Sequence, residues 1–250
     1  MFQTEPIIWL QSLASPALTW CMTAVTTLGY APVYVAGVLV LAFGVRMRPT
    51  LAVLVTILLS GILTETLKST LAFPRPSSVD GRVGEPGNPS PPSAVVDRGG
   101  GSDFWAPPTA EARAAFQERG SDGYGFPSGH VSTATAFLLA LAVWFRRKAV
   151  LGVAAVWVPL MALSRMYLGR HFLADVLGGV AVGLVAVFAA WLLLRPFERD
   201  ESPRPRAVGL VPLSGVTAVL LGTTALLAAV DAGNVHFLLK LGDRFQVFRC

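Results

Sequence analysis

The chain has 250 residues, of which 53% are hydrophobic and only 14% are charged. Soluble domains carry about a quarter charged residues, so this composition excludes a disordered chain and a nucleic-acid-binding tail. The formal net charge of +5 indicates little until the charges are assigned to sides of a membrane. The apolar residues form runs of about 20, the length of helix that crosses a bilayer, so the sequence predicts an all-α integral membrane protein.

The first predicted element is an amphipathic helix over residues 5–28 that lies on the membrane surface. Polar residues and a proline interrupt this stretch and weaken its hydropathy, while Trp9 suits the membrane interface. A seventh membrane span over the same residues is the alternative. No cleavable signal peptide is expected, because the first residues contain no basic segment.

Six membrane-spanning helices follow and form a predicted bundle over residues 28–230. A long loop rich in Pro, Gly, Ser and Asp interrupts them at residues 77–125. A loop of this length is either a flexible insert or a functional segment that covers a site. A tail over residues 231–250 closes the chain, and the whole of 1–250 is predicted to be one membrane domain. The expected spans are 28–45, 50–71, 130–145, 149–168, 172–194 and 207–230.

The charges of the connections predict the orientation of these spans. The connections after the first, third and fifth spans are short and basic, and by parity they lie on one side. Loops rich in Lys and Arg stay in the cytoplasm, so that side is assigned to it. The 77–125 loop has four Arg against seven acidic residues, which suits the outer side. We therefore expect a multi-pass protein of the plasma, or inner, membrane.

Three clusters of polar and titratable residues fall at the outer ends of the second to fifth spans. Charged groups near a membrane interior are costly, so such residues are candidates for function. The predicted topology brings all three clusters to the same, outer or periplasmic, face, where they can form one pocket. The clusters are Lys68 to Pro76, Phe126 to His130 and Ser164 to Asp175.

The third cluster holds a candidate nucleophile. His171 and Asp175 stand four residues apart, so on a helix they share a face. A carboxylate that accepts the Nδ1–H proton leaves the Nε2 lone pair free and stabilises the imidazolium that forms. This pairing makes His171 an activated nucleophile. His130, at the start of a span, is placed to protonate a leaving oxygen.

The other polar residues of the clusters predict a phosphate-binding pocket. Ser128 is a natural N-cap and Gly129 allows close approach of the backbone, so the free N–H groups of that helix start form an anion site. Lys68, Arg75 and Arg165 add three cations, which oppose the charge on the equatorial oxygens during phosphoryl transfer. Together with the two histidines, this set indicates hydrolysis of a phosphate ester through a phosphohistidine.

Some of these residues also have a plainer interpretation. His130, His171 and Asp175 would suit a metal ion, although no further His, Cys or carboxylate joins them in the sequence pattern. Glu65 stands one helical turn before the lysine of the first cluster and would neutralise it. Arg170 is interpreted as an interfacial anchor rather than as a residue that binds phosphate.

The three clusters resemble the signature motifs of the type 2 phosphatidic acid phosphatase superfamily. Those motifs read K-x6-R-P, P-S-G-H and S-R-x5-H-x3-D, and every fixed position is matched in this chain. The resemblance implies a compact helical membrane core and a mechanism that needs no metal or other cofactor. It also implies that His171 is the nucleophile, Asp175 its orienting partner and His130 the general acid. The implied phosphate-binding residues are Lys68, Arg75, Ser128, Gly129 and Arg165.

The same resemblance implies a lipid phosphate or diphosphate as the substrate. A prenyl diphosphate such as undecaprenyl diphosphate is expected first, and phosphatidate or phosphatidylglycerophosphate next, since the motifs bind phosphate and not the lipid. The expected partners are this substrate and membrane lipids, and no nucleic acid. Two alternatives are a vanadium-dependent haloperoxidase, a class that is soluble, and a catalytically silent member that binds or transports lipid, a class expected to lose the histidines.

Overall fold

The part of the chain that the structure describes is built from helices. The computed structural model describes residues 2–86, 106–111, 113–114 and 124–198. The described helices lie in the unit Met1–Asp200. Their bounds are α1 (Glu5–Ser12), α2 (Pro16–Thr27), α3 (Ala31–Gly44), α4 (Met47–Leu71), α5 (Pro76–Val79), α7 (Gly129–Trp144), α8 (Ala149–Tyr167) and α9 (Leu173–Glu198).

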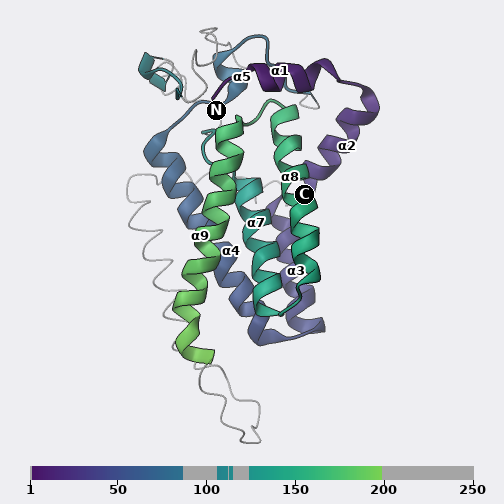
Figure 1. Ribbon diagram of the computed structural model, residues 1–250, viewed down its shortest axis with the longest axis vertical. Coiled ribbons are helices and arrows are strands. Elements are labelled where there is room, and N and C mark those ends of the chain that lie inside the picture. The colour runs from purple at the N-terminus through teal and green to yellow at the C-terminus, as the bar shows by residue number, and fades with distance from the viewer. Residues whose placement is uncertain (1, 87–105, 112, 115–123, 199–250) are drawn as a thin grey trace, which may run out of the picture. The chain divides into compact units, whose positions relative to one another are not determined.

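The helices α4, α7, α8 and α9 form a bundle in which α7 packs against the other three (Figure 1). The contact between α7 and α9 depends on two glycines of α9. A Cβ atom on Gly183 would come within 2.6 Å of Thr135 Cβ, and one on Gly179 within 2.7 Å of the Ser128 carbonyl oxygen. Small residues four positions apart let membrane helices approach closely, so these glycines set the spacing of the two helices.

Several of these helices are long and apolar enough to cross a membrane. By length and composition, the described residues contain three such segments, or four if α2 and α3 count as one broken span. Helix α7 is apolar but shorter. The helical membrane protein expected from the sequence is thus confirmed, while the count of six spans stays a prediction and its last span, 207–230, lies outside the described residues. The three segments are Met47–Val79, Ala149–Tyr167 and Leu173–Arg195.

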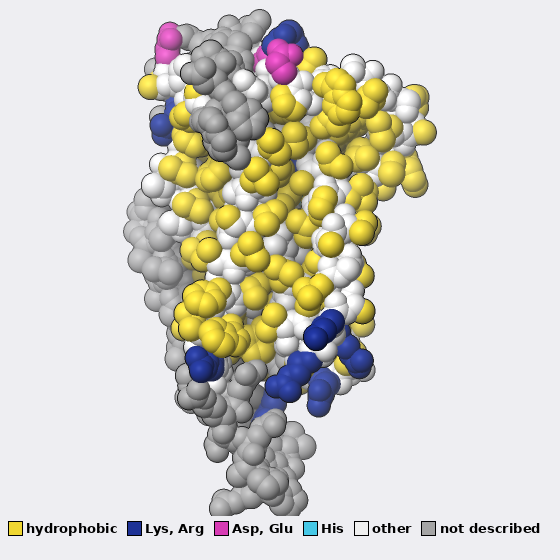
Figure 2. All heavy atoms as spheres, viewed as in Figure 1, with side chains coloured by type: hydrophobic (Ala, Val, Ile, Leu, Met, Phe, Trp, Pro, Cys, Tyr) yellow, Lys and Arg dark blue, Asp and Glu magenta, His cyan; other side chains and the backbone are white. Residues whose placement is uncertain are grey.

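Charged side chains gather at the two ends of the bundle. Figure 2 shows hydrophobic side chains over the middle of one face, acidic side chains near one end and most of the basic side chains near the other. Exposed apolar residues such as Val156 and Phe188 are costly in water and suit contact with lipid. The α3–α4 and α7–α8 connections and the end of α9 lie at the basic end (Figure 1). Their exposed basic residues are Arg46, Arg48, Arg146, Arg147, Lys148 and Arg195.

The N-terminal segment differs from the single helix predicted over residues 5–28. It forms two helices, because the Ser15 hydroxyl accepts a hydrogen bond from the Leu18 N–H at 3.2 Å and Pro16 begins α2. Helix α1 runs across one end of the bundle, and α2 packs along α8 before the chain bends by 53° into α3 (Figure 1). That this segment lies on the membrane surface stays a prediction.

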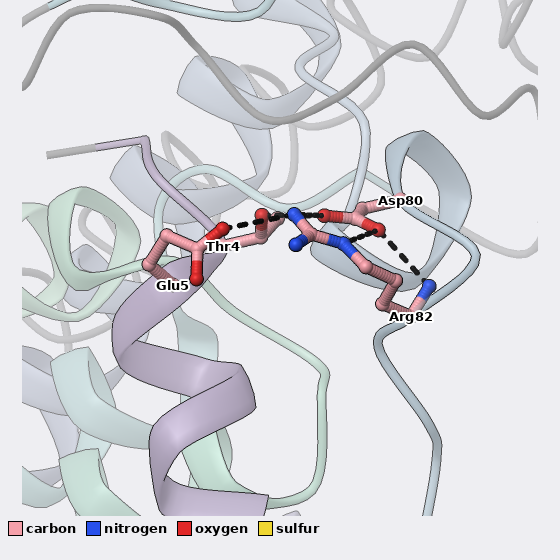
Figure 3. A network of polar contacts seen from close by, with 4 residues as sticks. All are labelled: Thr4, Glu5, Asp80 and Arg82. Atoms are coloured by element: carbon pink, nitrogen blue, oxygen red, sulfur yellow. Dashed lines mark hydrogen bonds and ion pairs between the residues drawn. The ribbon is translucent and has the colours of Figure 1, made fainter.

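Helix α1 is tied to the segment after α5 by a polar network (Figure 3). Thr4 Oγ1 donates to Asp80 Oδ2 at 2.6 Å, and Arg82 Nη2 bridges Asp80 Oδ2 at 2.8 Å and Glu5 Oε1 at 2.9 Å. The hydrogen bond from Arg82, helped by the one from Thr4, lowers the pKa of the buried Asp80 to about 2. The carboxylate is therefore ionised at neutral pH, and its charge holds α1 against this segment.

Phe2, just before α1, lies in a cluster of phenylalanine rings. Its ring centroid is 5.4 Å from that of Phe73, 6.3 Å from that of Phe126 and 5.7 Å from that of Phe172. Phe73 follows α4, Phe126 precedes α7 and Phe172 precedes α9. The cluster therefore joins the helix ends that carry the candidate site residues.

Candidate active site

The three sequence clusters meet where α4 ends and where α7 and α9 begin. Two backbone hydrogen bonds join these ends: Gly125 N–H donates to the Phe73 carbonyl at 2.7 Å, and Ser128 N–H to the Asp175 carbonyl at 2.9 Å. A Cβ atom on Gly125 would lie 2.9 Å from the Pro74 carbonyl oxygen and 3.0 Å from Asp175 Oδ2. This crowding allows only glycine there and brings parts of all three clusters into contact.

The structure places His171 beside Asp175, with His171 Nδ1 3.4 Å from Asp175 Oδ2. Both side chains are buried. The same carboxylate oxygen accepts a hydrogen bond from the Phe172 N–H at 2.8 Å, which fixes the carboxylate in the first turn of α9. With Nδ1 turned toward the carboxylate, Nε2 is the nitrogen that is available to attack an incoming phosphorus atom.

Three cations of the predicted set lie near enough to the two histidines to act on them electrostatically. Burial, followed by the positive charges of Arg165, Arg75 and Lys68, lowers the pKa of His171 well below its ordinary value. The imidazole of His130 also lies in the positive field of these three residues. His171 lies in the short connection between α8 and α9, and at neutral pH its imidazole keeps the lone pair that nucleophilic attack needs.

Lys68 lies beside the first turn of α7. A Cβ atom on Gly129 would be 3.8 Å from Lys68 Nζ, so this cation and the free N–H groups of the helix start face the same space. The predicted ion pair between Glu65 and Lys68 is confirmed at 3.2 Å. The Glu65 side chain is 68% exposed, and exposed ion pairs are weak, so a bound phosphate would compete with it for the ammonium group.

Ser128 holds the N-cap position of α7, but its hydroxyl makes no capping hydrogen bond within the described residues. Its Oγ atom is buried, as are His130 Nε2 and Asp175 Oδ1, and none of these three atoms has a hydrogen-bond partner there. Buried polar groups are normally paired, because an unpaired group costs about 1–3 kcal/mol. The Ser128 hydroxyl can donate to a ligand oxygen, as can His130 Nε2 when it carries a proton, whereas Asp175 Oδ1, a carboxylate oxygen, can only accept.

The two arginines of the third cluster have different partners. Arg165, in the last turn of α8, donates from Nη1 to Thr26 Oγ1 at 3.2 Å. Arg170, interpreted from the sequence as an interfacial anchor, makes an ion pair with Glu85 at 3.1 Å. Glu85 also accepts a hydrogen bond from the Ser77 hydroxyl at 2.7 Å. Arg170 is therefore bound to the segment after α5, whereas Arg165 is bound to a residue of α2.

Two residues that the motifs do not include lie against His130. The ring centroids of Tyr30 and His130 are 4.9 Å apart in an edge-to-face arrangement. A Cβ atom on Gly29 would come within 2.6 Å of His130 Cδ2. Both residues belong to the break between α2 and α3. The sequence signal that was available is a Gly-Tyr pair between two apolar helices, which by itself indicates only a turn.

The described part of the long loop reaches the end of α4. Arg113 Nη2 donates to the Leu71 carbonyl at 2.7 Å, and its guanidinium carbon lies 4.9 Å from the centroid of the Phe73 ring. A basic side chain at a helix C-terminus satisfies a free carbonyl and complements the helix dipole. Leu71 and Phe73 precede Arg75 by four and two residues, so the segment around Arg113 packs next to the site.

The described residues do not offer a set of ligands for a metal ion. Within them, no group of three or more His, Cys, Asp or Glu side chains is placed to hold a metal ion. His130, His171 and Asp175 belong to the residues that were searched. The three side chains are two imidazoles and one carboxylate beside positive charge, and imidazoles in such surroundings can serve as acid, base or nucleophile.

Two solved structures share the fold. Aquifex aeolicus LpxE superposes with a TM-score of 0.55 at 19% identity over 77% of this chain and 96% of its own. A PAP2-type phosphatidylglycerolphosphate phosphatase from Bacillus subtilis gives a TM-score of 0.52 at 23% identity over 81% and 87%. These likenesses show that the chain shares the fold of these two structures.

Sequence comparison identifies the family. The family model of the PAP2 superfamily matches residues 49–199, more than half of the chain, and the protein belongs to that superfamily. Human sphingosine-1-phosphate phosphatase 2 is 32% identical over 117 residues, which are 43% of this chain and 29% of that protein. Bacillus subtilis phosphatidylglycerophosphatase B is 36% identical over 74 residues, or 26% and 36%. The matches thus span about a third of each relative's length.

Proposed function

We propose that this protein hydrolyses a lipid phosphate or diphosphate through a phosphohistidine, without a metal cofactor. The observation that carries the proposal is the buried His171–Asp175 pair, at 3.4 Å, in the field of three cations. The names of the relatives, phosphatases of sphingosine-1-phosphate and of phosphatidylglycerophosphate, support a lipid phosphate as the substrate. A relative from Porphyromonas gingivalis named lipid A 4'-phosphatase supports the same class.

The proposed reaction has two steps. In the first, His171 Nε2 attacks the terminal phosphorus, a P–N bond forms, and the P–O bond to the leaving group breaks; the leaving group is the lipid alcohol of a monophosphate or the lipid monophosphate of a diphosphate. Asp175 stabilises the imidazolium while His130 gives its proton to the departing oxygen. In the second, water attacks the phosphohistidine with His130 as the base, the P–N bond breaks, and inorganic phosphate leaves.

The phosphate pocket in this proposal consists of cations and backbone N–H groups. Lys68, Arg75 and Arg165 oppose the negative charge on the equatorial oxygens, which is largest in the transition state. Ser128 adds a buried hydroxyl, and Gly129 lets the start of α7 approach the phosphate closely. None of these groups touches the lipid tail, which would lie against the apolar faces of the bundle.

Among substrates, a prenyl diphosphate such as undecaprenyl diphosphate is our first choice, followed by phosphatidate and phosphatidylglycerophosphate. The pocket binds phosphate and accepts any of these head groups, so the choice depends on residues outside the motifs. A haloperoxidase function fits poorly because such enzymes are soluble, whereas this chain has membrane-crossing helices. A silent lipid-binding member fits poorly because His130 and His171 are both retained.

Phosphate release from a panel of lipid phosphates is the test. We expect the purified protein in detergent to release phosphate at the same rate with and without a chelator, because the cations in its site are side chains. Orthovanadate should inhibit, because it resembles the phosphoryl transition state. Activity that disappears in chelator and returns with a divalent ion would overturn the metal-free mechanism. Lipid binding without release of phosphate would identify a silent member.

We also propose that the protein lies in the plasma membrane with its site on the outer, periplasmic face. Basic residues that are exposed at the other end of the bundle, such as Arg146, Arg147 and Lys148, support this orientation, since positive loops stay in the cytoplasm. The site end carries the acidic residues Glu5 and Asp80 and the segment that includes Arg113.

Labelling of single cysteines tests the orientation. In a chain without Cys21 and Cys250, a cysteine replacing the exposed Ala110 should react with an impermeant thiol reagent in intact cells. A cysteine replacing the exposed Lys148 is the matched control and should react only after the cells are permeabilised. The reverse pattern would place the site on the cytoplasmic side.

A further inference from the structure

The break between α2 and α3 lies against catalytic groups of the site. We propose that this break forms the wall that contacts the leaving group, and that Tyr30 determines which lipids the enzyme accepts. The inference rests on the proposed hydrolysis and adds the part of the site that distinguishes one lipid from another. The signature motifs cannot supply that part, because their residues bind the phosphate, which all the candidate substrates share.

The break is an irregular segment of backbone inside an apolar region. Helix α2 ends at Thr27 and α3 begins at Ala31, and the two are bent by 53°. The N–H groups of Gly29 and Tyr30 donate to carbonyls three residues earlier, at 2.9 Å and 3.3 Å, so a local turn satisfies them. Irregular backbone at membrane depth is tolerated where it is buried in protein or lines a cavity. Here it packs on the imidazole of His130.

The contact with His130 defines the chemistry of this wall. A general acid must touch the oxygen that it protonates, so the first atoms of the leaving group lie next to His130. Gly29 packs against Cδ2 of that ring, the carbon bonded to Nε2, where a Cβ atom would come within 2.6 Å. Tyr30 packs edge-to-face on the same ring and is 50% exposed, so half of its surface is available to the substrate.

The same segment also touches the phosphate pocket. In the last turn of α2, the buried Thr26 accepts a hydrogen bond from Arg165 Nη1 at 3.2 Å. The chain from Thr26 to Tyr30 thus passes from a phosphate-binding cation to the general acid. A lipid whose phosphate is bound by Arg165, and whose leaving oxygen faces His130, extends past Tyr30 as it leaves the pocket.

The test compares lipids that share a phosphate and differ in the atoms next to it. Phosphatidate and a long-chain prenyl phosphate serve as lipid substrates, and p-nitrophenyl phosphate serves as a substrate without a lipid. For Tyr30→Ala we expect the ratio of the two lipid kcat/KM values to change by about 10-fold or more, the usual effect of one lost pocket contact. Hydrolysis of p-nitrophenyl phosphate, which lacks a lipid backbone, is measured as a check of the site itself: a loss on this ester as large as the loss on both lipids would show that Tyr30→Ala disturbs His130 rather than the choice between lipids, and would overturn the assignment.

Two conservative variants and one distant variant serve as controls. Tyr30→Phe keeps the ring and should keep the wild-type ratio. Tyr30→Leu keeps part of the bulk and should give an intermediate ratio. The leucine variant provides the test if the alanine variant does not stay monodisperse. Phe43→Ala removes an aromatic ring that is 82% exposed near the other end of α3, and it should leave the ratio unchanged.

The outcomes separate this inference from the proposed function. If Tyr30→Ala and Tyr30→Leu hydrolyse both lipids at the wild-type ratio, or if Phe43→Ala shifts the ratio as much, the wall lies elsewhere. If the wild-type protein releases no phosphate from any lipid, the proposed function fails, and the assignment of Tyr30 fails with it. A changed ratio that phenylalanine restores supports the wall and places the effect on the ring of Tyr30.

Discussion

Replacing His171 by alanine is expected to stop the turnover of every substrate, whereas replacing His130 should spare substrates with a good leaving group. Either change should reduce the hydrolysis of a lipid phosphate by about 10²–10⁴-fold or more, as for positioned acid–base and nucleophilic groups. An aryl phosphate leaves without being protonated, so His130→Ala should recover most of its rate on that ester. His171→Ala should not recover, because no atom remains to attack phosphorus.

Asp175→Asn is the graded control for this pair of variants. The amide keeps the size of the side chain but removes the charge that stabilises the imidazolium, so its rate should lie between those of the wild type and His171→Ala. Rates are measured at saturating substrate, with folding checked by gel filtration. If His171→Ala recovers with the aryl ester and His130→Ala does not, then His130 is the nucleophile and His171 is the general acid. Near-native rates for both variants on all substrates would remove this cluster from the mechanism.

Gly179→Ala is expected to destabilise the protein and lower its activity together. The new methyl group would lie 2.7 Å from the Ser128 carbonyl oxygen and 3.2 Å from the Ser132 nitrogen. Both are backbone atoms, which cannot rotate aside, so α7 and α9 must separate. Overpacking of this kind costs about 1–3 kcal/mol. The displaced segment carries Ser128 and Gly129, so the phosphate pocket should lose its shape as well.

The matched control is Gly61→Ala, since Gly61 lies inside α4 and no described atom lies within 4 Å of its Cβ position. Alanine is the better helix former by about 1 kcal/mol, so this variant should be neutral or slightly more stable. Thermal unfolding in detergent and phosphate release are measured for both variants. Equal behaviour of the two would show that the contact between α7 and α9 tolerates a methyl group at Gly179.

The bounds of the long helices were largely predictable because charges or breaks limit each apolar run. The span predicted over 50–71 is α4 with the same last residue, and those over 149–168 and 172–194 begin within one residue of α8 and α9. Local sequence also contained the break that the prediction over 5–28 missed. Ser15 followed by Pro16 is a typical helix start, and it divides that segment into α1 and α2.

The surroundings of the site were not predictable in the same way, because they depend on contacts between distant segments. Ser128 has the sequence of an N-cap, yet its hydroxyl makes no capping bond within the described residues, which no local rule indicates. The contacts of Tyr30 with His130 and of Arg113 with Leu71 join segments that periodicity treats separately. The motifs contain the residues that we propose for catalysis, and they omit residues such as Tyr30 and Arg113 that pack around them.

The phenylalanine cluster around Phe2 has a consequence for the order in which the protein is made. A ribosome completes Phe2 first, then Phe73 and Phe126, and Phe172 only once most of the unit Met1–Asp200 has been synthesised. Its rings meet across these long separations, so the cluster closes late, after α9 has followed α8 into the membrane. A nascent chain that stops before Phe172 lacks the last ring of the cluster and also lacks Asp175, the proposed partner of His171. If His171 and Asp175 act together as proposed, we expect activity to begin only when the start of α9 has been made and has packed against α7.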